Sequence, residues 1–125
     1  FDKGDNYPCQ CCKTTFRLAQ KLDLKPDEYQ MSFQSRLGFA EWMKEYTDQT
    51  LKALPSKGMK NVQVICPGFS ADCLETIEEI SEENKGYFME SGGEKFGYIP
   101  ALNDRPDHIE FLTQLLLDNT YGWNN

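Results

Sequence analysis

Several patterns are absent from this 125-residue sequence, and each absence excludes a class of protein. No run of about 18 apolar residues occurs, so no segment is expected to span a membrane as a helix. The 13 lysines and arginines form no cluster and are outnumbered by 20 aspartates and glutamates. With a formal charge of −7, neither nucleic acid nor an anionic membrane surface is an expected partner. Neither a G-x-G-x-x-G nor a Walker pattern is present, so Gly92-Gly93 is interpreted as a helix stop and not as a phosphate cradle.

The cysteines do not form the pattern of a disulfide framework. Their number is odd, at five, and three of them are too close in sequence to pair with one another without severe strain. These three are Cys9, Cys11 and Cys12. Cys66 and Cys73 lie in apolar segments, where buried free thiols are expected. Free thiols, and the lack of an export signal at Phe1, predict a cytoplasmic protein.

Apolar periodicity divides the chain into alternating helices and strands. Helices are predicted over 9–22, 47–54 and 72–90 and from Pro106 onward. Strict alternation over 29–34 predicts a strand near a sheet edge, and apolar runs predict strands at 62–65, the most buried, and at 96–99. The last helix is expected to turn four residues inward, namely Ile109, Leu112, Leu115 and Leu116. The polar tail over 118–125 is expected to fray.

This order of elements predicts an α/β fold. Helix–strand alternation at such spacing favours right-handed crossovers and a three-layer parallel sheet with helices on both faces. Such a unit normally opens with a strand, so a first strand is expected to be missing before Phe1. The sheet edge exposed there would favour homodimers of the isolated piece by edge pairing. No repeat or linker interrupts residues 1–125, which are therefore expected to form one unit.

A row of carboxylates is the main candidate site. Glu75, Glu79 and Glu83 are four residues apart, so a helix would place them along one face. Like charges at this spacing repel by a few tenths of a kcal/mol per pair, and a hard divalent cation or a wet channel would relieve the repulsion. The structural alternative is a solvated acidic face that begins with a capping box of Asp72 and Glu75. The residues alone favour the structural alternative and leave the site open.

Other candidates carry weaker signals. The cysteine trio resembles a metal or cluster ligand set, but a closed site needs four ligands, so incidental thiols are favoured. His108 has no second ligand near it in sequence and is expected at the surface. The loops at 34–38 and 67–72 follow two predicted strands, where α/β sheets bind ligands. Trp42, near the first loop, would either stack on a planar ligand or pack in the core.

Four segments, in order along the chain, carry a family resemblance. They read Gly4-Asp5-Asn6-Tyr7-Pro8; Ser32-Phe33-Gln34-Ser35-Arg36-x-Gly38 with Trp42; Cys66-Pro67-Gly68-Phe69-x-Ala71-Asp72-Cys73-Leu74-Glu75-Thr76-x-Glu78-Glu79-Ile80; and Tyr98-Ile99-Pro100-x-Leu102-Asn103. Together they resemble the bacterial ferrochelatases, the lyases that insert ferrous iron into protoporphyrin IX in the last step of haem biosynthesis. The resemblance implies a chelatase-like fold of two similar, Rossmann-like halves with the porphyrin between them. This chain corresponds to the C-terminal half, and the N-terminal lobe of the same chain is the implied partner.

The resemblance also assigns roles to residues. Glu75 matches the catalytic glutamate that faces a histidine across the porphyrin, and that histidine belongs to a Ser-x-His-Gly-x-Pro segment expected shortly before Phe1. Glu75, Glu79 and Glu83 match a metal or proton path. The residues that match the lining of the macrocycle pocket are Gln34, Ser35, Arg36 and Trp42. Asp72 and Cys73 match neighbours of the catalytic glutamate and are expected to support it.

The resemblance makes Fe²⁺ a substrate, and no iron–sulfur cluster is expected. Carboxylates with a histidine suit the chemistry, because two pyrrole protons must leave while Fe²⁺ sheds water. The isolated chain is expected to be inactive, since half of the cleft and the histidine would be missing. Two alternatives remain at this point: a non-catalytic metal-binding or assembly module, and a related chelatase that acts on cobalt and sirohydrochlorin.

Overall fold

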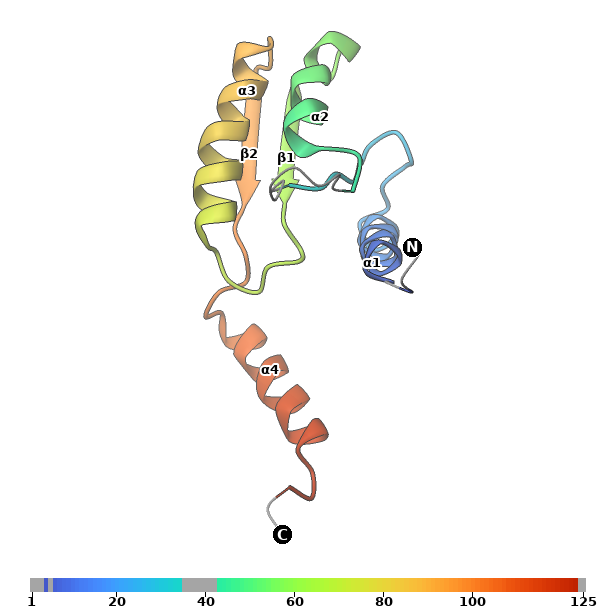
Figure 1. The fold of residues 1–125 in the computed structure, drawn as a ribbon, viewed down its shortest axis with the longest axis vertical. Coiled ribbons are helices and arrows are strands. Elements are labelled where there is room, and N and C mark those ends of the chain that lie inside the picture. The colour runs from blue at the N-terminus through green and yellow to red at the C-terminus, as the bar shows by residue number, and fades with distance from the viewer. Residues whose placement is uncertain (1–3, 5, 35–42, 124–125) are drawn as a thin grey trace.

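The computed structural model describes residue 4, residues 6–34 and residues 43–123. Its elements, in order, are α1 (Tyr7–Lys21), α2 (Thr47–Ala53), the 3-10 turn η1 (Pro55–Lys57), β1 (Asn61–Ile65), the π-helix η2 (Glu75–Asn84), α3 (Lys85–Glu90), β2 (Lys95–Ile99) and α4 (Pro106–Asn119) (Figure 1). The helices predicted over 9–22 and 47–54 and from Pro106 are confirmed, as are the strands at 62–65 and 96–99. η2 and α3 follow one another without a break and together form the long helix predicted before Gly92.

β1 and β2 form a parallel pair, with Val62 opposite Phe96 and Val64 opposite Tyr98. The long helix connects the two strands, and it packs beside α2 over the sheet (Figure 1). Because side chains alternate along a strand, one face of the pair carries the apolar residues that meet both helices. The buried members of this core come from the helices, and they are Leu51, Leu54 and Phe88. A small parallel sheet with helices packed on it is the architecture that the structure shows.

The opposite face of the sheet stays open in the described part of the chain. Ile65 is 49% exposed and Ile99 is 39% exposed on that face. β1, expected to be the most buried strand, alternates between half-buried and exposed residues. The three-layer arrangement with helices on both faces is therefore not confirmed. Along the described chain, no helix is long and apolar enough to cross a membrane.

The strand predicted over 29–34 is wrong. Only Phe33 pairs, through a single parallel bridge with Tyr46. The Phe33 N–H donates to the Glu45 carbonyl at 2.7 Å, and the Thr47 N–H donates to the Phe33 carbonyl at 3.0 Å. Tyr29 lies instead against α1, where it helps to line a small hollow. Alternation of apolar and polar residues indicates a half-buried extended segment. A strand also needs a partner strand along its length, and here the segment pairs with one residue, Tyr46.

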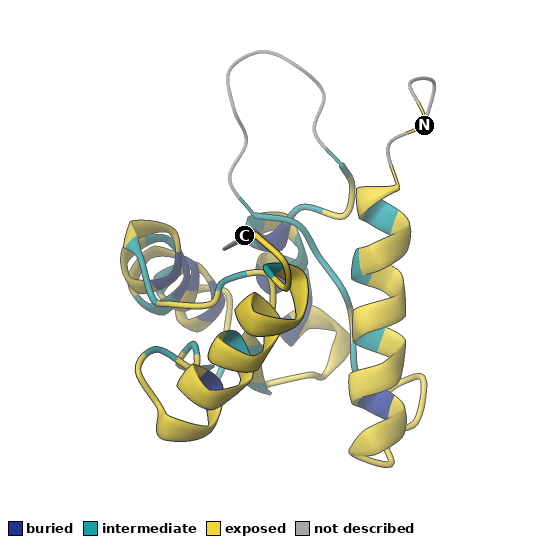
Figure 2. Ribbon diagram, turned by 90° about the horizontal axis from the view of Figure 1, so that it is seen from below, coloured by how far each residue is buried: buried dark blue, intermediate teal, exposed yellow. Residues whose placement is uncertain are grey.

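The inward orientation predicted for the last helix is wrong for three of its four residues. Ile109 and Leu115 are each 47% exposed and Leu116 is 65% exposed, whereas Leu112 is half-buried. α4 leads away from the sheet (Figure 1), and most of its surface is exposed in the view from below (Figure 2). The helix extends to Asn119, into the segment where fraying was expected, and the Thr120 N–H still donates to the Leu116 carbonyl. An amphipathic stripe specifies that a face prefers burial, but it does not specify the surface that buries it.

Candidate functional site

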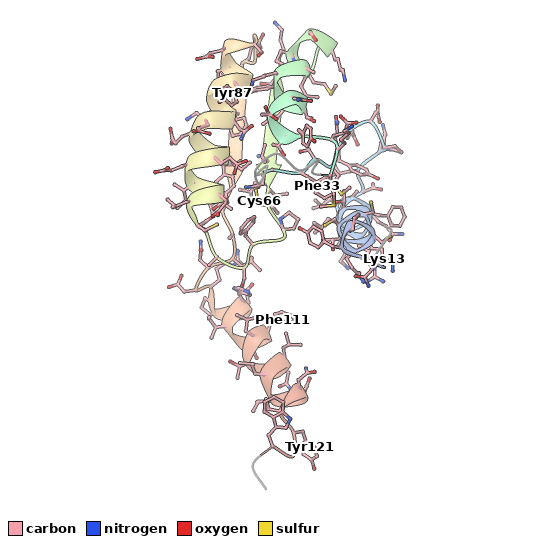
Figure 3. The ribbon with its side chains drawn as sticks, viewed as in Figure 1. Lys13, Phe33, Cys66, Tyr87, Phe111 and Tyr121 are labelled. Carbon is pink, nitrogen blue, oxygen red and sulfur yellow. The ribbon has the colours of Figure 1, made fainter. Side chains whose placement is uncertain are left out.

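A groove of about 580 Å³ lies between the long helix and the segments around Phe33 and α2. The long helix contributes Leu74, Glu75, Glu78, Glu79, Glu83, Asn84 and Tyr87, and the facing side contributes Phe33, Gln34, Tyr46, Thr47 and Asp48. The lining residues run from Glu75 at the start of η2 to Tyr87, which Figure 3 labels on α3, so the groove follows the length of this helix. All three carboxylates of the predicted row therefore lie along one cavity.

The electrostatic character of the groove is strongly negative. Among the described residues that line it, five are Asp or Glu and none is Lys, Arg or His. Lys52 lies beside it on α2, with its ammonium 3.8 Å from the centre of the Tyr87 ring and 3.8 Å from the Asp48 carboxylate. Like charges that line a low-dielectric cleft focus the field and raise the local concentration of counter-ions. The groove is thus suited to cations.

The carboxylates form a linear row along the helix and do not surround a single metal site. Among the described residues, no three Asp, Glu, His or Cys side chains converge closely enough to hold a metal ion. Glu75, Glu79 and Glu83 instead follow one another along a π-helix, whose i→i+5 pattern is rare and concentrates at functional sites. Such a row offers oxygen ligands one after another, which suits the passage of a cation better than its permanent retention.

Asn84 lines the same groove and is almost completely buried, at 2% exposure. Its Nδ2 donates to the Glu79 carbonyl at 2.6 Å, so the orientation of the amide is set by the helix itself. Its Oδ1 has no hydrogen-bond partner in the described part of the chain. Asn84 therefore places a buried, unpaired neutral oxygen next to Glu83, beneath the negatively charged wall.

Glu75 is held at the start of this helix by contacts on both its side chain and its backbone. The Cys73 side chain donates a hydrogen bond to the carboxylate, which lowers the pKa of Glu75, and the backbone N–H of Glu75 acts in the same direction. Gln34 donates from Nε2 to the Glu75 carbonyl at 2.7 Å. Its Oε1 accepts a hydrogen bond from the Cys66 thiol at 3.3 Å. Gln34 thereby joins the end of β1 to the beginning of the acidic row.

Asp72, three residues before Glu75, is the centre of a hydrogen-bond network. Its carboxylate accepts from the Tyr98 hydroxyl at 2.6 Å, from Asn103 Nδ2 at 2.8 Å, from Thr76 Oγ1 at 3.0 Å and from the Ala101 N–H at 3.2 Å. The hydrogen bond from Tyr98, followed by that from Asn103, lowers the pKa of Asp72 to about 2. A carboxylate that accepts this many hydrogen bonds remains ionised.

The capping box expected from Asp72 and Glu75 does not form. The Cys73 N–H donates to Thr76 Oγ1 at 3.0 Å, and Thr76 is fully buried. The Asp72 carboxylate therefore bonds the Thr76 hydroxyl and the loop at 98–103, and not a free helix amide. Its competing partners come from the end of β2, a segment that sequence spacing around residue 72 does not reveal.

The five cysteines are free thiols. Burial is the largest contribution that raises the pKa of Cys66 to about 11, and the nearby charges of Cys73, Glu79 and Asp72 raise it further. Cys66 is thus expected to remain protonated and to act as the hydrogen-bond donor to Gln34. Cys9 and Cys12 are exposed on α1 and Cys11 is half-buried, away from the groove.

The other predicted residues have different outcomes. Gln34 lies in the groove, whereas Ser35, Arg36 and Trp42 fall outside the described residues. His108, expected at the surface, is 7% exposed, because its ring is enclosed by Ser70 and Asn103. Sequence reasoning missed eight of the described lining residues: Phe33, Tyr46, Thr47, Asp48, Leu74, Glu78, Asn84 and Tyr87. Glu78 could have been predicted, because it lies next to Glu79 on the same helix. Asp48 could not, because it comes from a distant segment of the chain.

Comparison with known proteins identifies what this chain is similar to. A family model described as Ferrochelatase matches residues 1–120. A ferrochelatase from Hydrogenovibrio crunogenus is 63% identical over 123 residues, covering 98% of this chain and 32% of the relative. Ferrochelatases from Marinobacter nauticus and Cronobacter sakazakii are 62% and 53% identical, over 98% and 92% of this chain and 33% and 36% of the relatives. The chain thus spans about a third of the length of the curated relatives it matches.

Proposed function

Because this chain belongs to the ferrochelatase family, we propose that it works as the C-terminal part of an enzyme that inserts Fe²⁺ into protoporphyrin IX during haem biosynthesis. The observation that carries the proposal is the groove whose described lining holds five carboxylates and no basic side chain. In this proposal the lobe is a three-layer, chelatase-like unit. The porphyrin lies between it and an N-terminal lobe, and the free state of the cysteines supports a cytoplasmic location.

Glu75, Glu79 and Glu83 are proposed to carry Fe²⁺ along the groove to the porphyrin. Carboxylates are hard oxygen ligands that bind Fe²⁺ less tightly than imidazole or thiolate sites do, so the ion is able to leave each of them. Their spacing supports this role, since each successive residue lies about one helical turn further along. The carboxylates also compensate the charge of the ion while it loses water, and Asn84 offers an uncharged oxygen near Glu83.

The insertion step requires two pyrrole protons to leave as Fe²⁺ binds the four ring nitrogens, without a change in oxidation state. Glu75 is proposed as the catalytic group that receives the ion last. The hydrogen bond from Cys73 lowers the pKa of Glu75, which keeps the carboxylate anionic and available to the metal. The histidine expected upstream of this chain is the better proton acceptor, because its ordinary pKa lies close to neutral pH. Glu75 and that histidine would act from opposite faces of the ring.

Gln34 is proposed to connect the porphyrin pocket to the metal path. The chain runs from Gln34 directly into Ser35 and Arg36, which with Trp42 are proposed to line the macrocycle. Because Gln34 donates to the Glu75 carbonyl at 2.7 Å, the pocket segment and the catalytic carboxylate share one anchor. Asp72 and Cys73 support Glu75 from the other side, through Thr76 and through the Cys73 thiol.

The test uses the full-length enzyme that carries these residues, with haem formation followed by the loss of porphyrin fluorescence. We expect Glu75→Gln to lower kcat by about 100-fold or more, the range of a lost acid–base or metal-contacting group. Glu79→Gln is expected to raise KM for Fe²⁺ and to leave KM for protoporphyrin within about twofold. Glu82→Gln is the matched control, since Glu82 lies on the same helix, is exposed and does not line the groove.

Two results would contradict the proposal. Near-normal haem formation by Glu75→Gln would remove this residue from the catalytic role. An equal rise in KM for Fe²⁺ in Glu79→Gln and Glu82→Gln would show that net charge matters and the groove does not.

A further inference from the structure

Three hydrogen bonds close a ring around the imidazole of His108. The His108 Nδ1–H donates to the Asn103 carbonyl at 2.8 Å, and Nε2 lies 3.1 Å from Ser70 Oγ. The Asn103 N–H donates to the Ser70 carbonyl at 3.1 Å. Since a carbonyl only accepts, Nδ1 carries a proton, and Nε2 shares a hydrogen bond with the Ser70 hydroxyl. Each of the three residues is thus bonded to both of the others.

Asn103 extends this ring to Asp72. Its Oδ1 accepts from the Asp72 N–H at 2.8 Å, and its Nδ2 donates to the Asp72 carboxylate at 2.8 Å and to the Ala101 carbonyl at 3.1 Å. The backbone of Asn103 has φ 50°, in the left-handed region that non-glycine residues occupy at a cost of roughly 1 kcal/mol. The ring with His108 and Ser70 holds the backbone in this conformation, and the side chain is thereby aimed at Asp72.

The connection continues to the acidic row. Asp72 accepts from Thr76 Oγ1, and Thr76 is fully buried one residue after Glu75. The hydrogen bond between Asp72 and Thr76 therefore fixes the beginning of the long helix on the side of the 98–103 loop. Gln34 fixes it on the groove side. His108 touches neither the groove nor the carboxylates that line it, and it acts on them only through Asn103 and Ser70.

The geometry points to His108 as a positioning residue for the proposed metal insertion. It fixes Ser70 and Asn103, these fix Asp72, and Asp72 sets where the helix that carries Glu75 begins. This inference rests on the proposed function, because the group that it positions is the proposed catalytic carboxylate. A metal-bound Glu75 that shifts by about 1 Å loses roughly two orders of magnitude in rate, so a residue that prevents the shift contributes to kcat without touching substrate.

The test compares four variants of the full-length enzyme. His108→Phe keeps an aromatic ring and removes both nitrogens, Ser70→Ala removes one bond of the ring, and His108→Gln offers one donor and one acceptor in their place. Thr113→Ala is the control, because it removes a single exposed hydrogen bond to the Ile109 carbonyl on the same helix.

We expect His108→Phe to lower kcat about tenfold, with KM for protoporphyrin within twofold, and Ser70→Ala to lower kcat about threefold. His108→Gln is expected to recover part of the loss, and Thr113→Ala to match the wild type. The double variant of His108→Phe and Ser70→Ala should be no slower than His108→Phe alone, since both changes break the same bond. Hydrogen exchange of the 66–76 segment should become faster in His108→Phe and Ser70→Ala, faster to a smaller extent in His108→Gln, and stay unchanged in Thr113→Ala.

Each other outcome has a separate meaning. A wild-type kcat in His108→Phe, or a loss that only follows a loss of folded protein, overturns the positioning role and leaves the proposed function in place. Unchanged exchange over 66–76 in Ser70→Ala and His108→Gln overturns it as well, even if His108→Phe fails to fold. A wild-type enzyme that folds and makes no haem overturns the proposed function itself, and with it any role for His108 in insertion.

Discussion

Gly93→Ala is expected to destabilise the lobe through one contact. A Cβ at this position would overlap Cδ1 and Cε1 of Phe88 and would lie 2.8 Å from Cζ, whereas carbon atoms in van der Waals contact stay about 3.5–4.0 Å apart. Phe88 is 0% exposed in the core between the helices and the sheet, so its ring has no free space to enter. Overpacking of this kind costs about 1–3 kcal/mol of unfolding free energy.

The matched control is Gly86→Ala, which lies on α3 two residues before Phe88. A Cβ at Gly86 meets no atom within 4 Å. Because glycine inside a helix is about 0.5–1 kcal/mol less favourable than alanine, this change should stabilise the protein. The same Gly-to-Ala chemistry is thus expected to have opposite signs at two sites only seven positions apart.

Urea unfolding of the full-length protein, followed by far-ultraviolet circular dichroism, measures both changes. The midpoint should fall for Gly93→Ala and rise slightly for Gly86→Ala, with the slope m unchanged in each. Equal midpoints for Gly93→Ala and the wild type would refute the placement of Phe88 against Gly93. A loss of equal size in both variants would show that backbone freedom decides the outcome and the Phe88 contact does not.

Two further predictions concern titrating groups. The hydrogen bonds that lower the pKa of Asp72 to about 2 from its ordinary 3.8 stabilise the fold above the ordinary value, and this contribution is lost as pH falls through about 2. Asp72→Asn should therefore show a shallower loss of stability between about pH 4 and pH 2 in acid titrations, and an unchanged slope would argue against the network. The raised pKa of Cys66, about 11, should make iodoacetamide modify Cys66 more slowly than exposed Cys9 at pH 8, and mass spectrometry that finds equal rates would contradict its burial.

The sequence predicted the parts of the fold that depend on neighbouring residues. Proline and glycine placed the ends of the helices, as at Pro55 and Pro106, and apolar runs located both strands. Glu75, Glu79 and Glu83 line one groove, as their spacing along one continuous helix predicted, and their role in a metal path stays a prediction. The segment at 29–34 was predicted wrongly because strand formation depends on a partner, and its partner proved to be Tyr46 alone.

The parts of the site that sequence reasoning missed are those made between distant segments. Asp48 reaches the groove from α2, and nothing near residue 48 indicates that the long helix lies opposite. His108 was expected at the surface because its sequence neighbours are polar, but its ring is enclosed by residues that lie 5 and 38 positions away. A lone histidine without a nearby ligand therefore has a second explanation besides exposure, which is to bridge two loops.

The hydrogen-bond network of Asp72 also has a consequence for how the lobe folds. Its partners Tyr98 and Asn103 lie 26 and 31 positions later in the chain, so none of these bonds exists when the long helix first forms. Contacts of such long range form late, because the chain must first close the intervening loop. A nascent chain that has not yet added β2 would therefore have its carboxylates on a helix that lacks the contacts of Asp72 with Tyr98 and Asn103. Completion of the proposed iron path would coincide with the final cooperative step of folding, and partly made protein would hold Glu75 without the support of the Asp72 network.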